Sequence, residues 1–306
     1  MAEEVFDVVL LSTGVYPGNF QDWQNFPPPQ SDFSLGDDYW IGRLPHSIES
    51  ETVFDACEPA GYQFHPIRQF GYRYAFCRKV CPPDSGPEHY EWDHEGVIGR
   101  TLFLSRLIHP TTIASHYSAR LFFEDRSLIM VVPGRVRGYA TYVWIVATEW
   151  RDWLSQAEAE QLRNLMPVYI LNAAERVRRA RSHIDHAFHA FYLDQRTASL
   201  VSSFESLLKV ERHRATAQFV LRVPALAQTV GLVITPGEAE SLYDDRSVYV
   251  HGRQPNYTDL SDELMERYNK FETVLRRALL RASTDAPFCD LFQTDAAIIR
   301  SFGSLP

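Results

Sequence analysis

The spacing of apolar residues changes part-way along the chain, and this change constrains the fold more than any other feature of the sequence. Up to about residue 150, short runs of aromatic and β-branched residues are separated by turn residues, which is typical of an antiparallel sheet. Beyond that point apolar residues recur at intervals of three and four, as they do on amphipathic helices. The sequence therefore predicts an α+β protein, with a mostly antiparallel β domain over residues 1–150 and an all-α helical bundle over residues 151–306.

Strands are predicted in the first half wherever such a run is bounded by turn residues. Several of the runs alternate apolar and polar residues, as half-buried strands do. The proline-rich segments 27–29 and 81–88 are predicted to be loops. The predicted strands are "EVFDVVLLS", "YWIGRL", "YQFHPIRQFGYRYAFC", "GRTLFLSRLI", "ARLFFE", "SLIMVVPG" and "YATYVWIVA".

Five helices with short connections are predicted in the second half, which is the pattern of a helical bundle. The first runs over residues 153–191 and is kinked or restarted at Pro167, and the third is bent or broken at Pro224. The fourth has marked ends, because Thr235, Pro236 and Glu238 fit a capping box and Gly252 fits a C-terminal stop. The second, third and fifth helices cover residues 196–210, 212–231 and 261–283.

Composition and charge limit the classes of protein to which the chain can belong. At 306 residues and 45% apolar content it can bury about two sizeable cores. No run of eighteen apolar residues occurs and the start is acidic, so we expect a cytoplasmic protein with no membrane segment. The four cysteines are too few for a disulfide framework.

The net charge of −9 argues against a protein that coats nucleic acid non-specifically. The acidity is uneven: residues 1–150 carry 11 basic against 19 acidic side chains, whereas residues 151–306 carry 19 against 20. Arginine outnumbers lysine 27 to 3. Arginine favours bidentate phosphate contacts, although a codon bias of the source genome explains the ratio equally well.

Reactive side chains are concentrated in "LYDDRSVYVHGR", residues 242–253, on the fourth predicted helix. On an ideal helix Arg246 and His251 are separated by roughly 140° and about 7.5 Å, so they do not share a face. They can act on one phosphate only if the arginine side chain wraps around the helix or a second surface closes the site. The structural alternative is that Arg246 pairs with Asp245 or another acidic neighbour, while His251 caps the last carbonyls.

This segment, together with "SLVSSFESLLKVERHRATAQFVLRVPALAQTVGL" before it, resembles the HEPN superfamily, and specifically the Apea-like HEPN group. In that group an "ESLL" helix and a helix containing arginine and alanine precede a "YD-x-RS-x-x-x-HG" signature. The resemblance covers about residues 165–285. It implies a helical bundle that usually dimerises and often cleaves RNA without a metal. It also implies Arg246 and His251 as the catalytic pair, Ser247 as the polar residue after the arginine, and Glu205 as an orienting acid.

The implied chemistry suits these residue types. RNA supplies its own nucleophile, the 2′-hydroxyl, so a proton-transfer group and a cation suffice, with no metal and no cofactor. We therefore expect a metal-independent endoribonuclease that acts on RNA such as tRNA. By resemblance its setting is prokaryotic anti-phage defence or a toxin-like role. A homodimer through the bundle would complete the cleft, and the β domain would restrain the nuclease until a protein or ligand trigger binds.

Further basic residues are candidates for RNA contact, namely Arg178 and Arg181 on the first helix of the bundle and Arg253 after the fourth. The alternative for the first two is an ordinary solvated helix face. Zinc binding by Cys77 and Cys81, together with Cys57, His65, His89 or His94, is disfavoured against ordinary thiols.

The rival functional hypothesis is a non-catalytic HEPN-like module that dimerises or binds a ligand. Its β domain would then bind a protein or carbohydrate partner, and the aromatic residues of that domain would line the groove. These are Trp23, Trp40, Trp92 and Trp144.

Overall fold

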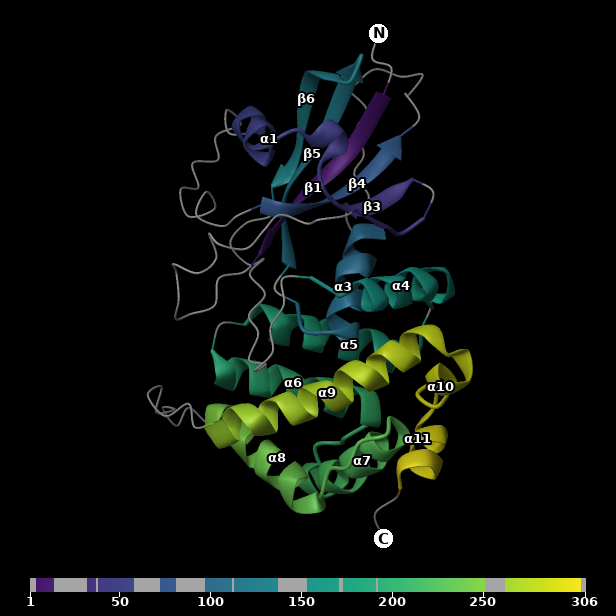
Figure 1. Cartoon of the computed structure of the whole chain (residues 1–306). Helices are drawn as coiled ribbons and strands as arrows, with labels where there is room; N and C mark the ends of the chain where they lie inside the picture. Colours follow the sequence, from purple (N-terminus) through teal and green to yellow (C-terminus); the bar gives the residue numbers. More distant parts are fainter. Residues whose placement is uncertain are drawn as a thin grey trace. The chain divides into compact units, whose positions relative to one another are not determined.

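The structure, a computed structural model, divides the chain into two compact units (Figure 1). Unit 1 comprises Met1–Ser105, Thr111–Trp144 and Trp150–Asn164, and unit 2 comprises Arg106–Pro110, Ile145–Glu149 and Leu165–Pro306. Within them the structure describes residues 4–13, 32–36, 38–57, 72–80, 97–111, 113–136, 153–170, 173–190, 192–250 and 262–303.

Unit 1 is built on a six-stranded antiparallel sheet with the order β2-β3-β4-β1-β5-β6, in which β1 lies between β4 and β5 (Figure 1). The predicted antiparallel β domain is confirmed. Its strands are β1 (Glu4–Thr13), β2 (Phe33–Ser34), β3 (Tyr39–Gly42), β4 (Tyr72–Val80), β5 (Ile113–Glu124) and β6 (Ser127–Val136).

The alternation of side chains along β1 explains its central place in the sheet. Phe6, Val8 and Leu10 lie on one face and join a buried cluster with residues of β4 and β5. Val53 of helix α1 (Ser50–Cys57), a helix that the sequence did not predict, packs into the same cluster. Val9, on the opposite face, is buried as well, so β1 is covered on both sides.

Residues 99–108 form a helix, α3 (Gly99–Ile108), so the strand predicted from the apolar run "GRTLFLSRLI" is wrong. Its buried residues include Thr101, Leu104 and Leu107, which recur at the spacing of a helix. The error arose because a short apolar run has no decisive period, and leucine is also among the strongest helix formers. The predicted strand over 139–147, the part 62–71 of another, and the predicted loops 27–29 and 81–88 lie outside the described residues.

The predicted helix over residues 153–191 is two helices, α4 (Gln156–Leu165) and α5 (Glu175–His189). The chain leaves the first one in a 3₁₀ turn over Met166–Val168 that contains Pro167, because proline lacks the N–H that the next turn of an α-helix requires. All residues of α4 except Leu165 belong to unit 1, whereas α5 belongs to unit 2.

The remaining helices of unit 2 follow the prediction closely, so the helical second half is confirmed. Helix α7 runs through Pro224 as one element. The two short helices after α9 were not predicted. The helices are α6 (Leu193–Leu208), α7 (Ala215–Thr229), α8 (Pro236–Val250), α9 (Asp262–Thr284), α10 (Ala286–Asp290) and α11 (Asp295–Phe302).

Aromatic contacts hold the centre of unit 2 together. The ring of Phe204 on α6 packs edge-on against Phe219 of α7 at 5.9 Å and Phe271 of α9 at 6.2 Å. The hydroxyl of Ser203 donates a 2.7 Å hydrogen bond to the carbonyl of Ala180. This bond fixes the register of α6 against α5.

Buried arginines link the ends of these helices. Arg196 donates to the carbonyl of Ala190 at 2.7 Å, and Arg222 donates to the carbonyl of Leu208 at 3.0 Å and to that of Gly303 at 3.3 Å. Helix-terminal carbonyls that lack a partner within the helix are thereby satisfied. No helix among the described residues is long and apolar enough to cross a membrane.

Candidate functional site

Helix α8 carries the predicted site, and its start is fixed by the capping box predicted from the sequence. The hydroxyl oxygen of Thr235 accepts a hydrogen bond from the Glu238 N–H at 3.2 Å, and Glu238 Oε2 accepts one from the Thr235 N–H at 2.7 Å. Lys270 of α9 pairs with the other oxygen of Glu238. The hydrogen bond from Lys270 and those from Thr235 lower the pKa of Glu238 to about 2.

The fold brings Glu205 and Arg246 together from two different helices, α6 and α8. Arg246 Nη2 lies 3.7 Å from Glu205 Oε2. The Tyr243 hydroxyl donates to Glu205 Oε1 at 3.0 Å. The guanidinium carbon of Arg246 also lies 5.6 Å from the centre of the Tyr243 ring. Glu205, Tyr243 and Arg246 therefore form one contact group, which we call the α6–α8 cluster.

Tyr243 anchors the α6–α8 cluster to the core of unit 2. It is 7% exposed, and its ring packs on Phe219 with a centroid distance of 5.0 Å. Burial raises the pKa of Tyr243, and the negative charge of Glu205 raises it further. The hydroxyl is therefore protonated near neutral pH and can donate to the carboxylate. Sequence reasoning did not assign Tyr243 a role, although its place three residues before Arg246 puts both on one side of the helix.

Arg246 has hydrogen-bonding capacity to spare. Its separation from Glu205 is that of an ion pair rather than of a hydrogen bond. Its Nε is buried and has no hydrogen-bond partner among the described residues. The side chain is still 25% exposed. A partly open guanidinium that no hydrogen bond from the described residues engages suits the binding of an anionic group such as a phosphate through its exposed part.

The acidic residues beside Arg246 do not pair with it. Asp245 forms an ion pair with Arg267 of α9 at 2.7 Å, so the part of the structural alternative that pairs Asp245 with Arg246 is wrong, whereas the pairing of Arg246 with another acid, which that alternative also allowed, is present with Glu205. Burial raises the pKa of Asp245, and the hydrogen bond from Arg267 opposes that rise. The acid that does face Arg246 is Glu205.

Of the other two predicted catalytic residues, the structure describes Ser247 but not His251. Ser247 is half-buried and its hydroxyl donates to the carbonyl of Tyr243 at 3.1 Å, which is a common back-bond within a helix. His251, Gly252 and Arg253 lie outside the described residues. Of the four residues implied as catalytic, the structure thus places Arg246, Ser247 and Glu205.

Arg181 is placed where it does not fit the predicted RNA contact. It is 9% exposed, donates to Ser283 Oγ at 2.9 Å and to the Tyr169 hydroxyl at 3.1 Å, and stacks on the Tyr169 ring. It lies on the buried side of α5, beside Val177 and Ile184. Arg178 is exposed on the same helix. Spacing alone could not separate the two, because both lie close to the edge of the apolar stripe.

The histidines of α5 do not converge. His189 shares a 2.7 Å hydrogen bond with the carbonyl of Asp185, whereas His186 is exposed. Burial and the neighbouring His186 lower the pKa of His183, and the charge of Glu205 opposes this. Cys77 is buried within the sheet. Within the described part of the chain, no group of three or more His, Cys, Asp or Glu residues could hold a metal ion.

Compared with known proteins, the chain matches no family model, no curated protein and no solved structure. Membership of the HEPN superfamily therefore stays a prediction.

Proposed function

We propose that the chain is a metal-independent endoribonuclease of the HEPN type. The observation that supports this best is the α6–α8 cluster. Two residues that the resemblance implied separately, Glu205 and Arg246, lie within 3.7 Å of each other, and Arg246 keeps unused donors. A cation in that state can stabilise the crowded phosphate that forms when a 2′-hydroxyl attacks its neighbouring phosphodiester.

In the proposed reaction each residue has one task. His251 removes the proton from the 2′-hydroxyl or donates one to the leaving 5′-oxygen. Arg246 stabilises the charge that develops on the phosphate, and Glu205 holds the guanidinium in place. Because Arg246 and His251 lie on different sides of an ideal helix, a second copy of the chain would complete the cleft. The products are a 2′,3′-cyclic phosphate and a 5′-hydroxyl.

The biological setting that we propose is cytoplasmic defence against phage, or a toxin-like role, with tRNA among the RNA substrates. The acidic β unit would hold the nuclease in check until a protein or ligand trigger binds. Its charge supports this role, since a surface with an excess of carboxylates repels RNA.

The test is RNA cleavage by the purified full chain, with total RNA and tRNA, in the presence and absence of EDTA. We expect cleavage that EDTA does not stop, with cyclic phosphate ends. Both His251→Ala and Arg246→Ala should abolish it. Arg246→Lys should also be weak, because a lysine keeps the charge but not the planar fork. Arg300→Ala on α11 is the matched control, since Arg300 is an exposed arginine away from the cluster.

Expression of the same variants in bacterial cells extends the test to conditions in which a trigger is present. Growth arrest by the wild type and its loss in His251→Ala would support the nuclease. If the wild type and both variants leave RNA and growth equally unaffected, with and without phage infection, the proposal fails. Cleavage that stops in EDTA would refute the metal-free mechanism. RNA binding without cleavage would favour the rival hypothesis, a non-catalytic ligand-binding module.

A further inference from the structure

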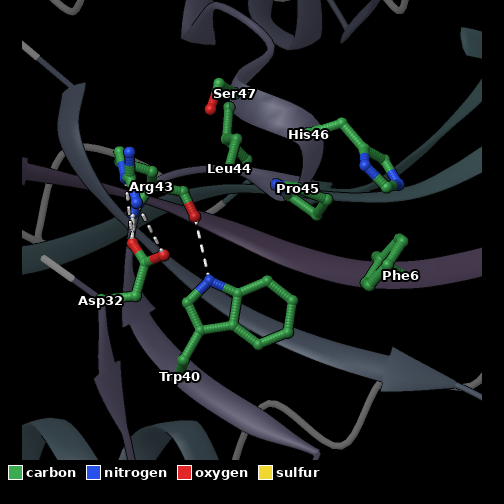
Figure 2. A pocket seen from close by; sticks show the side chains of 8 residues that line it. All are labelled: Phe6, Asp32, Trp40, Arg43, Leu44, Pro45, His46 and Ser47. Atoms are coloured by element: carbon green, nitrogen blue, oxygen red, sulfur yellow. Dashed lines mark hydrogen bonds and ion pairs between the residues drawn. The ribbon is translucent and has the colours of Figure 1, made fainter. Parts of the chain in front are cut away.

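Unit 1 contains a pocket of about 200 Å³ beside the sheet (Figure 2). Its walls come from β1, from β3, from the turn that follows β3 and from Asp32, the residue before β2. The apolar part is formed by Phe6, Trp40, Leu44 and Pro45, and the polar part includes Asp32 and Arg43. Nothing in the proposed ribonuclease mechanism uses this pocket.

The aromatic walls are held in fixed orientations. Phe6 and Trp40 meet edge to face, with centroids 5.8 Å apart and planes at 83°. Figure 2 shows the indole of Trp40 face-on and the ring of Phe6 beside it edge-on. The Trp40 Nε1–H donates to the carbonyl of Arg43 at 3.0 Å, and Phe6 also packs against Phe123 at 5.7 Å. The indole lines the pocket in a fixed orientation, so it needs no reordering when a ligand ring packs on it.

The polar end of the pocket presents a donor beside an acceptor. Asp32 Oδ1 accepts from the Arg43 N–H at 2.8 Å, and Asp32 Oδ2 accepts from Arg43 Nη2 at 3.3 Å. The arginine side chain is 52% exposed and the aspartate side chain 39% exposed. The interactions of the described residues leave Arg43 Nη1 without a bond to either oxygen, and Oδ2 has accepting capacity left. A ligand edge with both an acceptor and a donor can pair with the two groups together.

The charges around the pocket compensate one another. Arg43 is neutralised by Asp32. Glu4 pairs with the pocket residue His46 at 2.8 Å and with Lys79 at 2.7 Å, and these partners lower the pKa of Glu4. Among the described residues that line it, the pocket therefore has no surplus cation that would select a phosphate. An uncharged ligand fits it better, in contrast to the α6–α8 cluster.

The turn that closes the pocket has a strained backbone. His46 and Ser47 both have positive φ, 53° and 57°, in the left-handed region, which is unfavourable for residues other than glycine. The pairing of His46 with Glu4 and its ring contact with Phe123 at 4.7 Å hold this conformation. These contacts keep the wall of the pocket in one shape despite the strain, and a preformed wall is typical of ligand sites.

We propose that this pocket binds a nucleobase. A base is planar and uncharged, stacks on an indole face, and carries neighbouring hydrogen-bond donors and acceptors on its edge. Trp40 is the stacking platform, and the pair formed by Asp32 and Arg43 reads the edge of the base. The site does not depend on the proposed ribonuclease activity. If the predicted ligand trigger of the β unit binds in this pocket, its chemical class is a nucleobase.

The test is calorimetric titration of the full chain with the four nucleosides, their 5′-monophosphates and inorganic phosphate. We expect saturable binding of at least one base, with similar affinities for nucleoside and monophosphate, and none for inorganic phosphate. Because base stacking on an aromatic side chain contributes about 1–3 kcal/mol, Trp40→Leu should weaken binding about 5- to 150-fold. Trp40→Phe, which keeps a smaller ring, should bind with an affinity between those of the wild type and Trp40→Leu.

Further titrations test the role of Asp32 and Arg43 and show whether the bound base is free or part of a nucleic-acid strand. Arg43→Gln should reduce the preference among bases, whereas Arg126→Gln, an exposed arginine in the β5–β6 turn, should leave binding unchanged. A short single-stranded RNA that binds more tightly than any nucleoside would identify a base within a strand as the ligand. Equal or weaker binding of the strand would identify a free nucleoside or nucleotide.

Circular dichroism of each variant shows whether it is folded, so a loss of binding can be assigned to the pocket. The proposal is overturned if no nucleoside, nucleotide or RNA strand binds. It is also overturned if a folded Trp40→Leu binds as the wild type does, or if inorganic phosphate competes for the site. None of these outcomes bears on RNA cleavage by Arg246 and His251, so the two proposals fail separately.

Discussion

The charge of Glu238 at the start of α8 should stabilise unit 2 in a pH-dependent way. Replacing it with glutamine keeps a side-chain acceptor for the Thr235 N–H, since either residue completes a capping box. The change removes the ion pair with Lys270 and the negative charge near the helix N-terminus. Glu238→Gln therefore isolates the contribution of the charge.

The magnitude follows from the exposure of the pair. A pKa of about 2 in place of 4.5 would correspond to about 3 kcal/mol in a shielded site. The Glu238 side chain is 35% exposed and that of Lys270 41% exposed, so solvent screens the interaction strongly. An exposed ion pair contributes about 0.5 kcal/mol and a charge at a helix N-terminus about 0.5 kcal/mol. We expect a loss of about 1 kcal/mol, or a fall in Tm of about 2–4 °C for a unit of this size.

The sign of the pH dependence is fixed by the direction of the shift. The pKa of Glu238 is lower in the folded protein than its ordinary value of 4.5. Its stabilisation is therefore complete above about pH 4.5 and is lost as the pH falls toward about 2. The wild type and Glu238→Gln should differ most near neutral pH and converge at acidic pH.

The assay is urea unfolding at about pH 7 and about pH 3.5, followed by the helical signal in far-ultraviolet circular dichroism. The control is Glu240→Gln, which removes the same charge from an exposed position two residues further along α8. If Glu238→Gln and Glu240→Gln are equally stable at both pH values, the charge at the cap contributes nothing and the reasoning is wrong.

Three other outcomes are expected. Tyr243→Phe should lower the rate of RNA cleavage about 10-fold, because it removes the hydrogen bond from the tyrosine hydroxyl to the charged Glu205, and such a bond contributes about 1.5 kcal/mol. Unchanged cleavage would mean that the bond does not help Glu205 to orient Arg246. Arg181→Met should lower the free energy of unfolding by about 1–3 kcal/mol, because it leaves the Tyr169 hydroxyl and the Ile170 carbonyl without this donor. Chemical denaturation measures this, and a stable variant that has lost RNA affinity would restore the surface role of Arg181. The Cys77 thiol, whose pKa burial raises, should resist iodoacetamide until the protein unfolds, and peptide mapping by mass spectrometry would reveal early labelling.

Helix starts and strand alternation were the parts of the fold that the sequence predicted best. The capping box at Thr235 and Glu238 depends on three neighbouring residues, and the alternation along β1 depends on one strand. Local patterns of this kind do not need the rest of the fold to be known. The strand predicted for residues 99–108 was wrong, because a leucine-rich run suits a strand and a helix alike and only its packing decides between them.

The candidate site likewise combines features that a local sequence pattern indicates with features that only packing decides. The resemblance supplied Glu205 and Arg246, but no pattern in the sequence said that Tyr243 would bridge them, because that contact depends on how α6 and α8 pack. Arg181 was misjudged for a related reason. Its partner Ser283 is more than one hundred residues away in the sequence, so nothing near Arg181 indicated a buried, satisfied guanidinium. The Trp40 pocket likewise joins residues of β1 and β3 that the sequence separates.

The buried arginines of unit 2 bear on which exchanges of amino acid the protein tolerates. None of the three lysines is buried, whereas Arg106, Arg181, Arg196, Arg222 and Arg276 all are. Several of these guanidiniums span two or more acceptors on different parts of the chain, as Arg222 does between the ends of α6 and α11. An ammonium group has no flat fork with which to bridge acceptors set so far apart. Over evolutionary time these positions should therefore be closed to lysine even in a genome that prefers it.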